Sequence, residues 1–161
     1  MMVVSNTSPL TNLAAIGQFN LLQALYREIR IAESVWQELH ACGQAWPGGA
    51  EVDAASWVTH GTAQNGALVT ALRQDLDAGE AESIALAVEL KADLLLLDEK
   101  EGRHHAGRLN VRVMGTVGVL LQAKQNGLLP AVRPALDALR QTASFYLSQA
   151  VYAQVLKLTG E

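Results

Sequence analysis

Residues 93–98 read Asp-Leu-Leu-Leu-Leu-Asp, and this apolar run between two acids indicates the fold class. A strand with one face in water alternates apolar and polar residues, whereas a parallel strand covered on both faces is apolar throughout. We therefore expect a central parallel strand that ends at Asp98. In open sheets of this kind, ligands bind beyond the carboxyl ends of the strands, so Asp98 lies where a site is expected.

On either side of this run, strand-like and helix-like segments alternate along the chain. Further strands are expected at residues 2–5, 28–32, 55–60 and 111–114. Helices are expected from Pro9, at residues 19–26, from Ser34, at 67–72, 79–91 and 116–124, and after Pro134 and Ser148. The glycine- and proline-containing stretch 42–53 is expected to be a loop. This order predicts right-handed βαβ units, and hence a three-layer α/β/α sandwich around a parallel sheet.

The length and composition favour one soluble domain. The chain has 161 residues, 50% of them hydrophobic, which is enough for one core, so we expect a single domain over 1–161 in which 130–161 is a C-terminal helical extension. No apolar run approaches the roughly 18 residues of a membrane span. The first residues do not resemble a signal peptide, and the single cysteine, Cys42, cannot form an internal disulfide, so a cytoplasmic location is expected.

Polar residues gather at the predicted carboxyl edge of the sheet. Asn6 follows the first strand, and Asp98 ends the leucine-rich one. Oxygen ligands from separate elements are what Mg²⁺ prefers, and a bound ion lowers the pKa of a coordinated water. The net charge of −4 gives no basic excess for attracting a phosphate backbone, so a nucleic-acid substrate requires a bound cation or a basic partner to offset the local negative charge.

Four ordered blocks resemble those of PIN-domain proteins, particularly the VapC-like toxin group. The blocks are Val4-Ser5-Asn6-Thr7-Ser8-Pro9-Leu10, Asp77 to Ala87 with its Gly-Glu-Ala-Glu core, Leu96-Leu97-Asp98-Glu99, and Gly115 to Leu121. Together they cover about residues 2–127. Each block alone is weak, but four in this order are fairly specific.

The resemblance implies a Mg²⁺- or Mn²⁺-dependent endoribonuclease, the toxin of a toxin–antitoxin pair. Carried over by position, its catalytic residues are Asn6, Glu38, Glu80 and Asp98, and its metal ligands are Asn6, Glu80 and Asp98, with Glu82 in reserve. Glu82 lies about 200° around a helix from Glu80, so the two cannot both face one ion. The expected partners are RNA, a cognate antitoxin protein and a second copy in a homodimer.

Asn6 departs from the family pattern, which has aspartate at this position. An amide oxygen can still coordinate a cation, but the site has one negative charge fewer and should bind metal more weakly. The alternative function is therefore a catalytically weakened PIN-like domain that binds RNA or protein. Glu80 and Glu82 also have a structural alternative, since acids favour the first turn of any helix, and Glu38 has the alternative of an ordinary solvated helix residue.

Other polar residues suggest weaker hypotheses. His104 and His105 are adjacent and lack further ligands, which disfavours zinc. Arg103 and Arg108 are candidates for RNA phosphates or for a solvated face. Pro9 stands where a nucleotide-binding domain has a glycine loop, which disfavours that class. The apolar residues of 145–156 complete the core or form a subunit contact.

Overall fold

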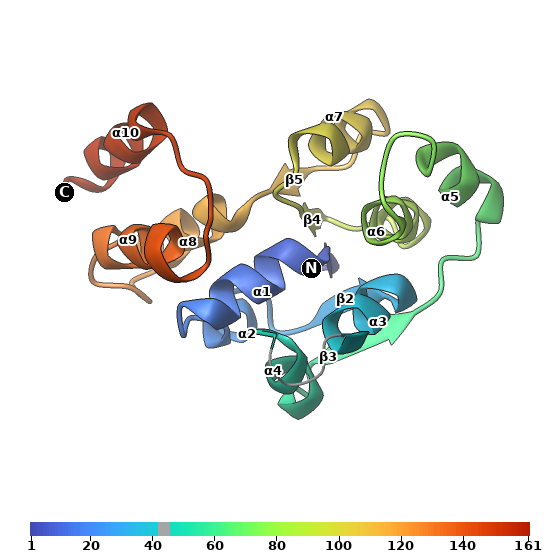
Figure 1. Ribbon diagram of the computed structural model, residues 1–161, viewed down its shortest axis with the longest axis horizontal. Helices are drawn as coiled ribbons and strands as arrows, with labels where there is room; N and C mark the ends of the chain where they lie inside the picture. Colours follow the sequence, from blue (N-terminus) through green and yellow to red (C-terminus); the bar gives the residue numbers. More distant parts are fainter. Residues whose placement is uncertain (42–45) are drawn as a thin grey trace.

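The computed structural model describes residues 1–41 and 46–161, and a parallel sheet runs through it (Figure 1). The strands are β1 (Val3–Ser5), β2 (Ile29–Ala32), β3 (Val58–Gly61), β4 (Leu94–Leu96) and β5 (Val113–Met114). Every neighbouring pair is parallel, in the order β3-β2-β1-β4-β5. The leucine-rich run is β4, beside the central strand β1, as its composition predicts.

Helices cover both faces of this sheet. They are α1 (Thr7–Ala15), α2 (Asn20–Tyr26), α3 (Glu33–Ala41), α4 (Gly49–Ala54), α5 (Gly66–Leu72), α6 (Ala78–Glu89), α7 (Lys100–Arg108), α8 (Thr116–Gln125), α9 (Arg133–Thr142) and α10 (Gln149–Thr159). Figure 1 shows α5, α6 and α7 to one side of the sheet and α1, α2 and α8 to the other, and α6 contacts β1, β2 and β4. The three-layer α/β/α fold is confirmed.

The chain order places a crevice between β1 and β4. From β1 the chain builds outward through β2 and β3, and it then returns to the other side of β1 to add β4 and β5. The loops that leave β1 and β4 therefore diverge to opposite faces, which is where parallel sheets bind ligands. The backbone N–H of Asn6, just beyond β1, donates to the Leu96 carbonyl at 2.9 Å. The residues after both strands are thus held side by side.

The core is built around the leucine run and α6. Leu95, Leu96 and Leu97 are fully buried, as are Ile84 and Ala85 of α6. Alanines along α6 let the helix lie close to the sheet, so that even its first turn is buried. Gly79 of that turn is consequently brought close to Asn6, the residue after β1.

The prediction of a loop over 42–53 is wrong for its second half. Residues 42–45, with Cys42, lie outside the described residues, but 49–54 form α4. The carboxylate of Glu51 accepts from the Gly48 N–H at 2.9 Å, which caps the helix start. Val52 is buried and anchors the helix to the core. Capping and one apolar contact outweigh the glycine-rich composition.

Two further details differ from expectation. The helix α7 was not predicted, because the residues it buries are the small Gly102 and Ala106, which leave no apolar periodicity. Ser34 does not cap α3, which begins at Glu33; instead the Ser34 N–H and hydroxyl both donate to Glu82.

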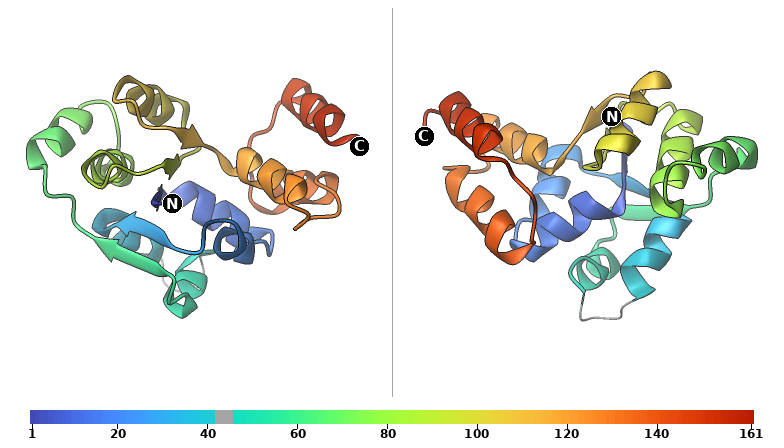
Figure 2. Two further views of the ribbon diagram at one scale, coloured as in Figure 1. Left: turned by 180° about the vertical axis from the view of Figure 1, so that it is seen from behind. Right: turned by 45° about the horizontal axis from the view of Figure 1, so that its top comes forward.

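The C-terminal helices pack against the rest of the chain. Figure 2 shows α8, α9 and α10 together at one end of the molecule in both views, and α9 also contacts α1. The Tyr152 hydroxyl of α10 donates to Asp137 of α9 at 2.8 Å, and the Arg140 guanidinium lies 4.3 Å from the centre of the Tyr152 ring. Within the described residues, no helix has the length and apolar character needed to cross a membrane.

Truncating the leucine run should destabilise the fold strongly. Leu96 is fully buried in β4, so Leu96→Ala should lower the free energy of unfolding by about 2–5 kcal/mol through lost burial and the cavity left behind. Urea titration followed by circular dichroism measures this. Leu158→Ala, at a side chain that is 69% exposed, is the control and should change it by less than about 0.5 kcal/mol. Equal effects would contradict the assignment of β4 as a buried strand of the core.

Candidate functional site

Asn6 presents an unsatisfied oxygen at the crevice. Its side chain is almost fully buried, and its amide nitrogen donates to Glu99 Oε2 at 3.2 Å. The amide oxygen, Oδ1, is buried without any hydrogen-bond partner. Buried polar atoms are nearly always paired, so an orphaned oxygen at a strand end indicates a place for a ligand.

The space that Asn6 faces is lined by acids and depends on a glycine. Gly79 lies in the first turn of α6, and a Cβ at this position would meet three side-chain oxygens. They are Glu38 Oε2 at 3.0 Å, Asn6 Oδ1 at 3.3 Å and Asp77 Oδ1 at 3.6 Å. The Thr7 hydroxyl donates to Glu38 Oε2 at 2.8 Å and fixes that carboxylate. Three oxygens from separate elements thus surround one small space, which we call the oxygen cradle.

Glu99 is a site residue that the sequence reasoning missed. Its carboxylate accepts hydrogen bonds from the Asn6 amide and from the Ser8 hydroxyl. Both donors lie in the Asn-Thr-Ser-Pro segment that follows β1. Glu99 therefore supplies a negative charge directly beside the position where Asn6 lacks one. The only sequence signal for it was its place next to Asp98.

Asp98 was predicted to be a metal ligand, and in the structure both of its carboxylate oxygens accept hydrogen bonds from the protein. Its Oδ1 accepts from the Thr116 N–H at 2.6 Å, and its Oδ2 accepts from the Thr116 hydroxyl at 2.6 Å and from Asn12 at 3.2 Å. Burial raises the pKa of Asp98, the Thr116 bonds act in the opposite direction, and the charge of Glu99 raises it further. Asp98 thus joins the end of β4 to the start of α8, and buried Thr116 is a second residue that the sequence reasoning did not single out.

Burial and the charges of nearby carboxylates both disfavour the ionised forms of Glu80 and Glu38. The Glu80 side chain is buried against α7, where its Oε2 would lie 3.1 Å from a Cβ on Gly102. Burial raises the pKa of Glu80 to about 8, helped by hydrogen bonding with Asp77 and by nearby carboxylate charges. Burial also raises the pKa of Glu38, opposed by the Thr7 hydrogen bond and reinforced by the charges of Asp77 and Glu99. The acids therefore repel one another when no cation is bound.

Glu82, the reserve ligand, lies away from the oxygen cradle. Its carboxylate accepts from the Ser34 N–H at 2.8 Å, from the Ser34 hydroxyl at 2.7 Å and from the Ala63 N–H at 3.3 Å. These bonds tie α6 to the start of α3 and to the segment after β3. The opposite directions of Glu80 and Glu82 follow from their spacing on one helix.

The donor set of the cradle suits a hard divalent cation. Within residues 1–41 and 46–161, no group of three or more His, Cys, Asp or Glu side chains is arranged so that it could hold a metal ion. The amide oxygen of Asn6 is nevertheless an additional donor, and it is orphaned and faces Glu38 across Gly79. Oxygen donors of this kind, completed by water, match the preference of Mg²⁺.

His105 pairs with Asp75 at 3.3 Å and with Glu101 at 3.7 Å.

Two hollows border the acids. One of about 410 Å³ is lined by Glu38, Asp77 and Gly79 together with neighbouring residues of α3 and α6. Another of about 410 Å³ is lined by Asp98 and Arg103, by β5 and by the segment before α10. Open surface therefore adjoins Glu38 and Asp77 at one hollow and Asp98 at the other.

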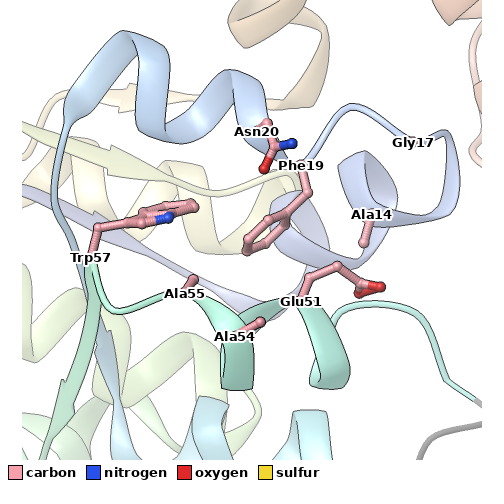
Figure 3. Close-up of a pocket in the computed structure, with 8 residues that line it drawn as sticks. All are labelled: Ala14, Gly17, Phe19, Asn20, Glu51, Ala54, Ala55 and Trp57. Atoms are coloured by element: carbon pink, nitrogen blue, oxygen red, sulfur yellow. The ribbon is translucent and has the colours of Figure 1, made fainter.

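A third hollow, shown in Figure 3, lies at the opposite edge of the sheet. Its volume is about 380 Å³, and its wall includes Phe19 and Trp57, whose rings are 5.3 Å apart. Trp57 precedes β3, so this hollow is at the amino ends of the strands. Among the described residues that line it, Glu51 is the only ionisable one, and it already caps α4. The carboxylates around Asn6, namely Glu38, Asp77 and Glu99, are not among its described lining residues.

The raised pKa of Glu80 predicts how stability depends on pH. Between about pH 4.5 and 8 the folded chain keeps a proton on Glu80 that the unfolded chain releases. In a chelator, the free energy of unfolding should therefore fall as pH rises through this window. Glu80→Gln should reduce this fall, whereas Glu28→Gln, at an exposed residue that makes no ion pair within the described part of the chain, should leave it unchanged. Urea titrations at a series of pH values measure it, and an identical slope in wild type and Glu80→Gln would contradict the assigned pKa.

Comparison with known proteins agrees with this geometry. A family model described as a PIN domain matches residues 2–161, nearly the whole chain. A search of curated proteins found no match. The match extends past the four blocks recognised in the sequence and includes α9 and α10. The chain belongs to the PIN-domain family.

Proposed function

We propose that this chain is a Mg²⁺- or Mn²⁺-dependent endoribonuclease that hydrolyses RNA phosphodiester bonds. PIN domains are in general metal-dependent nucleases, which gives the reaction class. The observation that carries the proposal is the orphaned Asn6 oxygen, which faces Glu38 across the space above Gly79. This oxygen cradle lies at the crevice between β1 and β4, where the fold favours ligand binding.

The residues have different roles in this proposal. Asn6 and Glu38 would hold the ion, with Asp77 and Glu99 near enough to add negative charge. Once bound, a divalent ion lowers the pKa of a coordinated water and offsets charge on the phosphodiester. Glu99, oriented by Ser8 and Asn6, is placed to accept the proton of an attacking water.

In this proposal, Asp98 and Glu80 lie near the ion but do not coordinate it directly. Asp98 is a positioning residue, because its bonds to Thr116 and Asn12 fix the strand end that carries Glu99. Glu80 carries a proton near neutral pH, since its pKa is raised to about 8, and a cation held nearby would favour its ionised form. Ionised Glu80 would therefore add a negative charge close to a bound metal ion.

The alternative function is a PIN domain with weakened catalysis that binds RNA or protein. Two observations favour it: Asn6 removes one carboxylate from the site, and Asp98 is occupied by Thr116. The role as a toxin, the antitoxin partner and the homodimer are proposals supported by the VapC-like blocks of the sequence. A cytoplasmic location is a proposal supported by the single cysteine and by first residues that do not resemble a signal peptide. Metal-dependent cleavage separates the enzyme from the binding module.

The deciding experiment incubates the purified chain with single-stranded RNA and Mn²⁺. The wild type should cleave, and Glu38→Gln should lower the rate by roughly 10²-fold or more, as expected when a group that stabilises the reaction is removed. Glu101→Gln removes the same charge from an exposed position and should retain activity. No cleavage by the folded wild type with any divalent ion would contradict the enzyme and favour the binding module.

Gly79→Ala serves as a second variant in this experiment, because it alters the cradle without removing a carboxylate. The added methyl group would lie 3.0 Å from Glu38 Oε2, in the space assigned to the ion. Mn²⁺ affinity, measured by calorimetric titration, should fall roughly 10- to 100-fold, the range seen when the surroundings of a metal site are disturbed. The methyl group requires the Glu38 carboxylate to shift, so circular dichroism and urea titration of the metal-free variant check that it is folded. Unchanged Mn²⁺ binding would place the ion elsewhere.

A further inference from the structure

The hollow next to Asp98 has walls of a different character from the acidic cluster. Its lining comes from α7, β5, the start of α8 and the segment between α9 and α10. It is largely apolar, and the described lining residues with charged side chains are Asp98 and Arg103 alone. Asp98, which lines the hollow, directly precedes Glu99 in the chain, so the hollow lies at the end of β4 from which Glu99 also extends.

Tyr146 stands exposed at the edge of this hollow. Its side chain is 87% accessible, although the residues on both sides of it are held to the protein. The Phe145 N–H donates to the Leu139 carbonyl at 3.0 Å, and buried Leu147 accepts from Arg140 at 3.0 Å. The aromatic ring is therefore presented to solvent from a fixed backbone, which suits stacking against a flat ligand.

Arg103 provides a cation beside the same hollow. A Cβ on Gly115 would lie 3.3 Å from Arg103 Nη1 and 2.9 Å from Asp98 Oδ1, so the guanidinium lies close to the end of β4. Among the described residues, the ion pairs of α7 are made by His105 and not by Arg103. Arg103 is exposed and available to an anion. Its guanidinium is suited to bidentate binding of phosphate.

We propose that this hollow is a nucleotide subsite for single-stranded RNA, in which a base stacks on Tyr146 and the adjoining phosphate binds Arg103. The inference rests on the proposed ribonuclease function and adds where the strand lies next to the acids. An aromatic ring together with a cation is the combination used for sequence-tolerant binding of single strands. A positive group here also offsets the repulsion between the acidic cluster and the RNA backbone.

The test measures binding of a fluorescein-labelled oligouridylate by anisotropy, in chelator and at several salt concentrations. Tyr146→Ala should weaken binding roughly five- to 150-fold, and Tyr146→Phe should stay near wild type because it keeps the ring. Arg103→Gln should weaken binding and reduce the slope of log affinity against log salt by about 0.7, which is the loss of one phosphate contact. Arg108→Gln, on the same helix but outside the hollow, should change neither.

A second readout separates this inference from the metal proposal. A 2-aminopurine base in the oligonucleotide should lose fluorescence when it stacks on Tyr146, and the Mn²⁺ affinity of Tyr146→Ala should equal that of the wild type. Equal RNA affinity of the wild type, Tyr146→Ala and Arg103→Gln would overturn the subsite. So would a wild type that binds no oligonucleotide, which would favour a polypeptide on this surface. Failure of the proposed function appears instead as absent Mn²⁺ binding and absent cleavage.

Discussion

The parallel pairing of β1 with β4 is the constraint on which the site depends. Val3, Val4 and Ser5 pair with Leu94, Leu95 and Leu96, and the Asn6 N–H continues the ladder to the Leu96 carbonyl. This register sets the segment after β1 against Asp98 and Glu99, although more than ninety residues separate them in the chain. Burial of the leucine run stabilises the register, because a shift by one residue would draw Asp93 or Asp98, the acids that bound the run, into the apolar layers.

Charge is the second constraint, and under the proposed function it accounts for metal binding at a site with asparagine in place of aspartate. Burial and mutual repulsion raise the pKa values of Glu38, Glu80 and Asp98. These carboxylates repel one another when they are ionised, and a bound cation would offset that repulsion. A further aspartate at position 6 would add to it. With Asn6, the same position contributes a neutral oxygen and an N–H donor that holds Glu99. Asparagine at position 6 therefore lacks one negative charge but orients the carboxylate of Glu99.

Much of the fold was predictable because its signals are local. The apolar run of β4 and the apolar side of α6 indicate a covered parallel sheet, whereas the strand order was not predicted and comes from the structure. The helices α4 and α7 were not found, because their formation depends on a cap at Gly48 and on close packing at Gly102 rather than on periodicity. In the site, Asn6 and Glu38 were predicted and the structure brings them together across Gly79. Spacing alone did not distinguish Asp98 from Glu99, because successive residues leaving a strand point in different directions.

The most direct test of the central claim is a crystal structure of the chain soaked with Mn²⁺, with the metal located by its anomalous scattering. Asn6 Oδ1 and Glu38 should be ligands of the strongest anomalous peak, above Gly79, with water completing the coordination sphere. A peak bound by Asp98 and Thr116 instead would show that the ion occupies the start of α8. No peak at the carboxyl edge of the sheet, at a Mn²⁺ concentration that supports cleavage, would contradict the metal site altogether.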